Sequence, residues 1–93
     1  MIKLVIVYDI ADIKTNNNIR HYLKTIGFNI QKSVFEVHTD YKNINKISQK
    51  LTELLGDNGS IILYNLGSIN RDNTIRIGNN ALGEAIDNNY III

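Results

Sequence analysis

Apolar residues follow two different patterns along this chain. From Leu4 to Val7 and from Ile61 to Leu66 both alternating faces are apolar, which is typical of strands that are covered on two sides. Between them, apolar residues recur at i, i+3, i+7, i+10 and i+11, and this spacing predicts a helix that begins near Asp40 and ends at Gly56. The apolar positions of that helix are Ile44, Ile47, Leu51, Leu54 and Leu55.

A second helix is expected at about 16–26. Ile19, Tyr22, Leu23 and Ile26 share one face there, Thr15 and the asparagines after it are cap candidates, and Gly27 suits a left-handed C-terminal position. Residues 28–39 are rich in β formers, and 31–33 is the one plausible reversal, so a tight hairpin and a single bent strand are both open.

The order strand, helix, strand pair, helix, strand predicts an α+β, ferredoxin-like βαββαβ antiparallel sheet with two helices on one face. Past Gly67 we expect a short strand at 74–78 and an extra C-terminal strand at 90–93. We therefore predict a domain over 1–78 and a tail over 79–93. Because two helices cover one face only, a second copy should cover the other in a homodimer that the tail completes.

Composition narrows the class of protein. The chain has 93 residues, enough for one domain, and no cysteine, which excludes disulfide frameworks and thiolate metal sites. No apolar run approaches the roughly 18 residues needed to span a bilayer, so we expect a cytoplasmic protein without a membrane partner. The net charge of +1 does not indicate a polyanion partner, and no glycine-rich phosphate loop is present.

Asp9 is the first candidate for catalysis and metal binding. It follows Tyr8 at the C-terminal end of the first strand, where a side chain leaves the core while the strand holds its position. Hard carboxylate oxygens suit Mg²⁺ or Mn²⁺, and a second copy of Asp9 in a dimer would supply a second carboxylate. Asp12 is a candidate to assist from the turn. The alternative is that Asp9 only ends a strand and accepts hydrogen bonds from the loop.

Other candidates, which include Tyr8 and Asp12, form a nucleic-acid or active-site rim around this strand end. Ser33 and Phe35 are candidates to line a substrate groove, although a turn role for Ser33 and a core role for Phe35 are favoured. Three basic residues lie in or near the first expected helix, and they form either a basic rim or an ordinary solvated face. They are Lys14, Arg20 and Lys24. The two histidines are far apart in sequence and lack ligand spacing, which favours structural roles over general base catalysis.

Several of these segments together resemble a known family, the second CRISPR-associated protein, which is the small subunit of the spacer-acquisition module. The resemblance runs nearly end to end. It rests on Tyr8-Asp9-Ile10, Gly27, the string Gln-Lys-Ser-Val-Phe-Glu over 31–36, the strand 62–66 and the apolar C-terminus.

The resemblance implies a ferredoxin-like homodimer that bridges two dimers of the larger integrase subunit. It also implies a metal-dependent endonuclease activity on RNA or double-stranded DNA, with Asp9 in the position of the metal-binding acid. The family usually carries basic residues where this chain has Thr15, Asn16 and Asn29.

Three function classes stay open from the sequence. They are a metal-dependent nuclease, a non-catalytic scaffold that holds DNA for an integrase, and a ferredoxin-like toxin-type ribonuclease or regulatory module. An RNA-recognition motif is disfavoured because its basic-Gly-aromatic string is absent.

Overall fold

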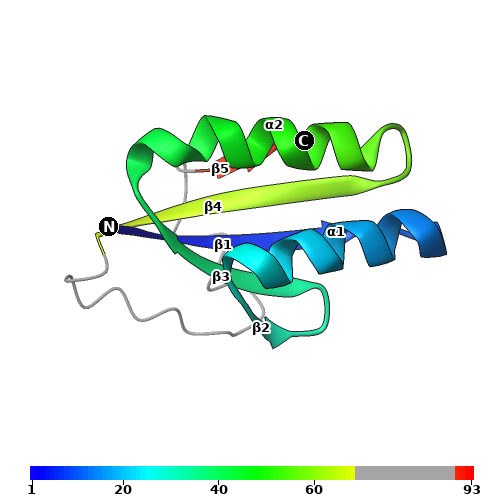
Figure 1. Cartoon of the computed structure of the whole chain (residues 1–93), viewed down its shortest axis with the longest axis horizontal. Helices are drawn as coiled ribbons and strands as arrows, with labels where there is room; N and C mark the ends of the chain where they lie inside the picture. Colours follow the sequence, from blue (N-terminus) through cyan, green and yellow to red (C-terminus); the bar gives the residue numbers. More distant parts are fainter. Residues whose placement is uncertain (69–89) are drawn as a thin grey trace.

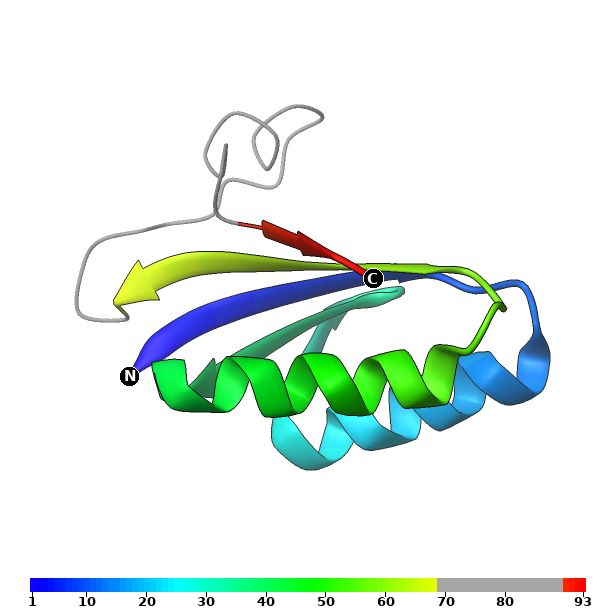
Figure 2. The same ribbon diagram turned by 90° about the horizontal axis from the view of Figure 1, so that it is seen from above.

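One antiparallel sheet carries two helices on one of its faces (Figures 1 and 2). The structure is a computed structural model, and it describes residues 1–68 and 90–93. In chain order the elements are β1 (Ile2–Asp9), α1 (Ile13–Ile26), β2 (Phe28–Gln31), β3 (Val34–Thr39), a 3₁₀ helix (Tyr41–Asn43), α2 (Ile44–Leu55), β4 (Ser60–Ser68) and β5 (Tyr90–Ile92).

The strand order within the described residues is β2-β3-β1-β4-β5, with antiparallel pairing throughout. β1 lies at the centre, between β3 and β4, as its doubly apolar pattern predicted. The first four strands and the two helices form the ferredoxin-like βαββαβ arrangement, so the predicted fold class is confirmed.

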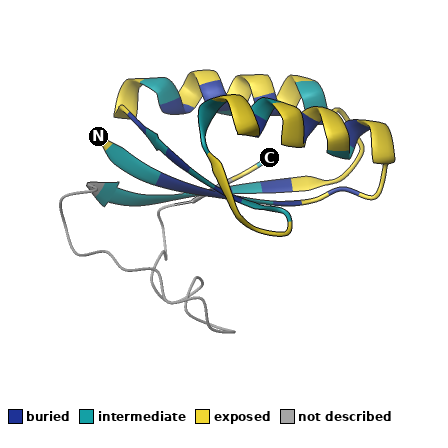
Figure 3. Ribbon diagram, turned by 60° about the horizontal axis from the view of Figure 1, so that its bottom comes forward, coloured by how far each residue is buried: buried dark blue, intermediate teal, exposed yellow. Residues whose placement is uncertain are grey.

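The core lies between the sheet and the helices. Leu4 and Ile6 of β1 point into it and meet Ile19 and Leu23 of α1 and the apolar stripe of α2. Figure 3 shows the buried positions along the inner faces of both helices and the exposed positions on their outer faces. Side-chain directions repeat every 3.6 residues in a helix and every 2 residues in a strand, and these repeats place the apolar side chains in one layer.

Helix α1 begins earlier than the sequence indicated, at Ile13 instead of about residue 16. The reason is the cap: Asp12, and not Thr15 or the asparagines, accepts the orphan N–H of the first turn. Gly27 is extended and not left-handed, which corrects a second expectation. It is needed because a Cβ there would collide with the main-chain carbonyl of Glu36.

The start of α2 also differs from the prediction. Asp40 precedes the 3₁₀ helix and makes no side-chain capping bond, and α2 itself begins at Ile44. The question left open at 31–33 is answered by a tight hairpin: β2 and β3 are separated by Lys32 and Ser33 alone, and Ser33 has a φ of 61°.

The C-terminal strand β5 pairs with β4 of the same chain. Ile61 and Ile93 exchange two main-chain hydrogen bonds, of 3.3 and 2.8 Å. The expected strand at 74–78 and the boundary at 78/79 lie outside the described residues. The contribution of the tail to a dimer stays a prediction. None of the helices within residues 1–68 and 90–93 is both long and apolar enough to cross a bilayer.

Candidate functional site

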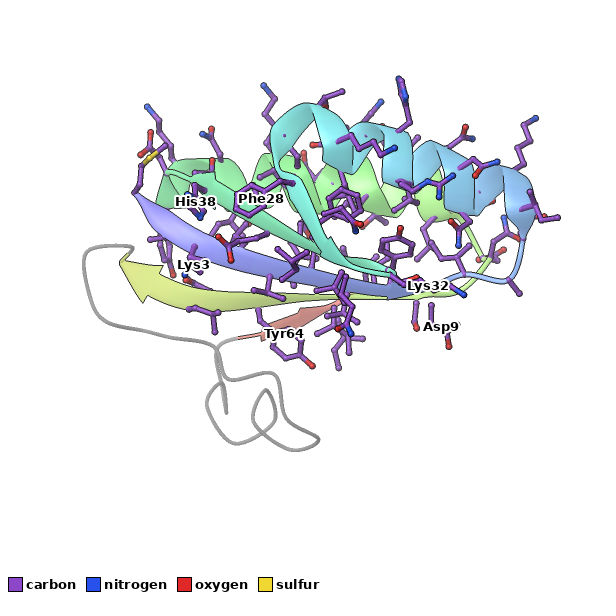
Figure 4. The ribbon with its side chains drawn as sticks, turned by 90° about the horizontal axis from the view of Figure 1, so that it is seen from below. Lys3, Asp9, Phe28, Lys32, His38 and Tyr64 are labelled. Carbon is purple, nitrogen blue, oxygen red and sulfur yellow. The ribbon has the colours of Figure 1, made fainter. Side chains whose placement is uncertain are left out.

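Asp9 is the last residue of the central strand, and its side chain is exposed. Figure 4 shows it at one end of the sheet, on the face opposite the helices. Behind it, β1 is buried on both sides from Leu4 to Ile6, and Ile10 directly after it is buried again. The carboxylate therefore projects from a main chain that is held firmly on either side.

The neighbouring strand supports this position. Asp9 is opposite Ser60 in the β1–β4 register, which places the Ser60 side chain on the same face. Gly59, with a φ of 148°, lies against the main-chain carbonyl of Asp9, so closely that a Cβ would not fit. Any larger residue there would have to push the end of β1 aside.

Tyr8 points the other way, toward the helices. Its side chain is only 5% exposed, and its ring stacks on that of Phe35, with centroids 6.3 Å apart and planes at 27°. Burial raises the pKa of Tyr8, while the nearby Arg20 guanidinium and a hydrogen bond with the Ser33 side chain act in the opposite direction. Three of the predicted rim residues, Tyr8, Arg20 and Ser33, are thus brought together.

The rim prediction is wrong for Phe35, whose favoured core role is confirmed, and it stays a prediction for Asp12. Phe35 is 0% exposed, so it packs in the core and cannot contact a substrate. The Asp12 carboxylate accepts hydrogen bonds from the Thr15 N–H and hydroxyl at 2.9 and 2.7 Å, and these bonds lower its pKa. It is already committed to capping α1.

Lys32 was not singled out by the sequence analysis. It forms the tip of the β2–β3 hairpin, is exposed, and lies at the same end of the sheet as Asp9 (Figure 4). Its position in a two-residue turn was the available signal, because a lysine in such a turn is held at the end of the sheet. To use that signal, the sequence analysis would have had to prefer the tight hairpin to the bent strand for residues 28–39.

The opposite end of this sheet face holds a polar cluster. His38 and Glu36, two residues apart on β3, are in contact, with the His38 Nε2 atom 2.6 Å from a Glu36 carboxylate oxygen, and Phe28 meets the His38 ring edge-on at 5.5 Å. Figure 4 places His38 and Phe28 far along the sheet from Asp9. His38 therefore has a structural partner, while His21 is exposed on α1.

A metal ion would find few donors within a single chain. Within residues 1–68 and 90–93 no group of three or more His, Cys, Asp or Glu side chains converges. Asp9 offers hard oxygen donors and is accessible, but it is one carboxylate. The donor chemistry suits Mg²⁺ or Mn²⁺, and the donor number fits only if a second chain contributes.

Comparison with known proteins adds independent information. Residues 1–74 match the family model described as CRISPR associated protein Cas2. A protein of Nanoarchaeum equitans (strain Kin4-M) named CRISPR-associated endoribonuclease Cas2 is 29% identical over 83 residues, which are 89% of this chain and 86% of that protein. A solved structure described as a crystal structure of Cas2 superposes with a TM-score of 0.68 at 25% identity, covering 83% of this chain and 86% of the other. With this fold and with Tyr8-Asp9 at the end of its central strand, the chain belongs to the Cas2 family of CRISPR-associated proteins.

Proposed function

We propose that this chain is a metal-dependent endoribonuclease that works as a homodimer, with Asp9 of each copy as the catalytic, metal-binding residue. The observation that carries the proposal is an exposed carboxylate at the end of a buried central strand, on the sheet face that neither described helix covers. The relative from Nanoarchaeum equitans is named an endoribonuclease, which supports RNA as the substrate.

The cofactor in this proposal is Mg²⁺ or Mn²⁺. A divalent ion supplies polarisation of the phosphate and activation of a water molecule. The two Asp9 carboxylates would hold it, each on a main chain that is fixed by the buried strand behind it. Without the ion the two carboxylates would repel each other across the dimer.

The dimer is proposed to form through the sheet face opposite the helices. That face carries the partly buried Val7, Val34 and Ile62 together with the more exposed Phe28 and Ile92, at 49% and 65%. Covering such a face with a second copy removes apolar surface from water, worth roughly 25 cal/mol per Å². A stable dimer of this kind buries ~1,200 Å² or more.

In the cell, the proposed role is spacer acquisition in the cytoplasm together with dimers of a larger integrase subunit, and double-stranded DNA is then a second ligand. A non-catalytic scaffold for that integrase is the second candidate function. It is favoured because no group of three or more His, Cys, Asp or Glu side chains converges in the described part of the chain, and because Thr15, Asn16 and Asn29 stand where the family usually has basic residues.

The test compares the parent chain with Asp9→Asn on labelled RNA and duplex DNA, with Mg²⁺, Mn²⁺ or a chelator. Asp40→Asn is the matched control, because Asp40 is also exposed and makes no capping bond. We expect Asp9→Asn to lose cleavage while folding and dimerisation are kept, and Asp40→Asn to behave as the parent. Equal cleavage by all three proteins would reject Asp9 as the catalytic residue. Duplex binding without any cleavage would leave the scaffold role in its place.

A further inference from the structure

Two exposed cations carry this inference, Lys32 at the tip of the β2–β3 hairpin and Arg20 on α1. Lys32 has neither a hydrogen bond nor an ion pair in the described structure. Arg20 is exposed on α1 and donates one hydrogen bond, of 3.0 Å, to the Asn17 side chain. A guanidinium has five N–H donors, so most of its donors stay available for an anion.

Lys32 is next in the sequence to a contact between the hairpin and β1. The Tyr8 N–H donates to the Ser33 carbonyl oxygen at 3.1 Å, which fastens the hairpin tip to the end of β1. The Arg20 guanidinium and a hydrogen bond with the Ser33 side chain both act against the rise of the Tyr8 pKa, which places the two groups near the phenol. Lys32 and Ser33 therefore lie at the hairpin tip beside the end of β1, and Arg20 of α1 is the cation that acts on Tyr8 there.

The backbone at Ser33 gives a second reason to regard this region as functional. A φ of 61° is uncommon for a residue with a Cβ, and glycine or asparagine is the usual choice there. A serine keeps a hydroxyl at this point at some conformational cost. Strained residues of this kind cluster where a ligand is held.

We propose that Lys32 and Arg20, together with the Ser33 hydroxyl, bind a phosphate of the RNA backbone next to the one positioned at Asp9. Tyr8 and Asp9 are consecutive, so the Ser33 contact beside Tyr8 and the Asp9 carboxylate lie on opposite faces of the sheet, and an RNA strand that passes around the end of β1 would reach Ser33 and Asp9. The site supplies backbone affinity without reading bases. It also places cations near this strand end in a chain that has Thr15, Asn16 and Asn29 where its family is usually basic. The inference rests on the proposed function, since it assumes RNA as the ligand.

The test measures the salt dependence of binding, with every variant in the Asp9→Asn background so that the probe is not cut. The probes are a single-stranded RNA of about 20 nucleotides, longer than one typical single-strand site, and a DNA duplex of the same sequence. The variants are Lys32→Gln, Arg20→Gln and the double substitution, and Lys50→Gln is the matched control because Lys50 is exposed on α2. Circular dichroism checks that all of them fold.

For a single strand, each lost phosphate contact lowers the slope of log affinity against log salt by about 0.7. The measured quantity is the ratio of the affinity of the control to that of the variant. As salt rises from about 50 to about 200 mM, this ratio should fall by about 2.6-fold for each single substitution and by about 7-fold for the double one. Cleavage by the same variants with Asp9 restored should fall with the affinity.

The outcomes separate this inference from the proposed function. If the parent binds and cleaves RNA and the slopes of all variants equal that of Lys50→Gln, the phosphate site is rejected and the nuclease stands. If the slopes change with duplex DNA but not with RNA, the assignment to RNA is overturned. If the parent binds neither probe at any salt concentration, the inference and the proposed function both fail.

Discussion

Gly59 lies so close to the main-chain carbonyl of Asp9 that no other residue fits between β4 and the end of β1. The contact joins the turn before β4 to the one exposed carboxylate of the central strand. Its φ of 148° is also a conformation that residues with a Cβ rarely adopt. The position of Asp9 is therefore set by a glycine 50 residues further along the chain.

Gly59→Ala should destabilise the protein by more than about 1 kcal/mol and lower nuclease activity further than the loss of folded protein explains. The added Cβ meets both the Asp9 carbonyl and Ile10, so the end of β1 must move. Denaturant unfolding and cleavage assays on the folded fraction measure the two effects.

Gly56→Ala is the control for this substitution. Gly56 also has a positive φ, 56°, but a Cβ there meets only open space and the distant Asn58 side chain. It should lose stability through backbone strain and keep its activity per folded molecule. If Gly59→Ala matches it in both measurements, the contact with Asp9 does not position the carboxylate.

The dimer prediction is tested at Ile92. This side chain is 65% exposed and, being opposite Ile62, lies on the sheet face away from the helices. Ile92→Asp would place an unpaired carboxylate in the proposed interface, and we expect the dissociation constant to rise at least about tenfold, or ~1.4 kcal/mol.

Ile13→Asp is the matched control, because Ile13 is 78% exposed at the start of α1, on the helix side of the molecule. A carboxylate is well tolerated at a helix N-terminus, so the fold should be kept. Sedimentation of both variants across concentrations gives the comparison. Equal dissociation constants for the two variants would mean that the dimer does not use this face.

The elements of the fold follow from the sequence because their signals are local. The stripe on α2 and the doubly apolar β1 and β4 each lie within a dozen residues, and they were predicted correctly. Boundaries were less accurate where two residues compete for one role. Both Asp12 and Thr15 are cap formers, and Asp12 takes the role because its carboxylate reaches both the N–H and the hydroxyl of Thr15.

The candidate site was predictable only in part. Asp9 was found from its place at a strand end, which is a local feature. The grouping of Tyr8, Arg20 and Ser33 joins a strand, a helix and a hairpin, and no spacing in the sequence encodes it. The rim prediction for Phe35 was wrong because alternation along β3 points it into the core, where Tyr8 stacks on it.

The capping role of Asp12 predicts a change of stability in acid. Its pKa is lowered in the folded protein from an ordinary value of 3.8 by the bonds from Thr15. Above pH 3.8 this contribution is fully present, and it is lost as the pH falls through the lowered value. Asp12→Asn keeps a good cap without a charge, so its stability should fall less steeply in acid than that of the parent.

Asp12→Ala should be less stable than both proteins at pH 7, since it leaves the Thr15 N–H without its partner. Urea unfolding at several pH values between about 2.5 and 7 measures these differences. An acid profile of Asp12→Asn identical to that of the parent would show that other carboxylates govern the transition.

Tyr8 predicts a corresponding change of stability in alkali. Burial raises its pKa above the ordinary 10.0, so the unfolded chain loses this proton at a lower pH than the folded one. The stability contributed by the neutral phenol is complete below pH 10.0 and is lost as the pH rises through the raised value. Tyr8→Phe removes the titrating group and keeps the ring against Phe35, so the loss of stability above pH 10 should become smaller.

At pH 7 the same variant should lose about 1 kcal/mol, because the hydrogen bond with Ser33 is gone. Tyr22→Phe is the control: burial also raises the pKa of Tyr22, without a hydrogen bond to lose, so it should share the alkaline effect and not the loss at pH 7. Guanidinium unfolding of the three proteins at pH 7 and between pH 9 and about 11.5 separates the alkaline effect from the loss of stability at pH 7. If Tyr8→Phe and Tyr22→Phe are equally stable at pH 7, the Tyr8 hydroxyl adds no net stability through Ser33.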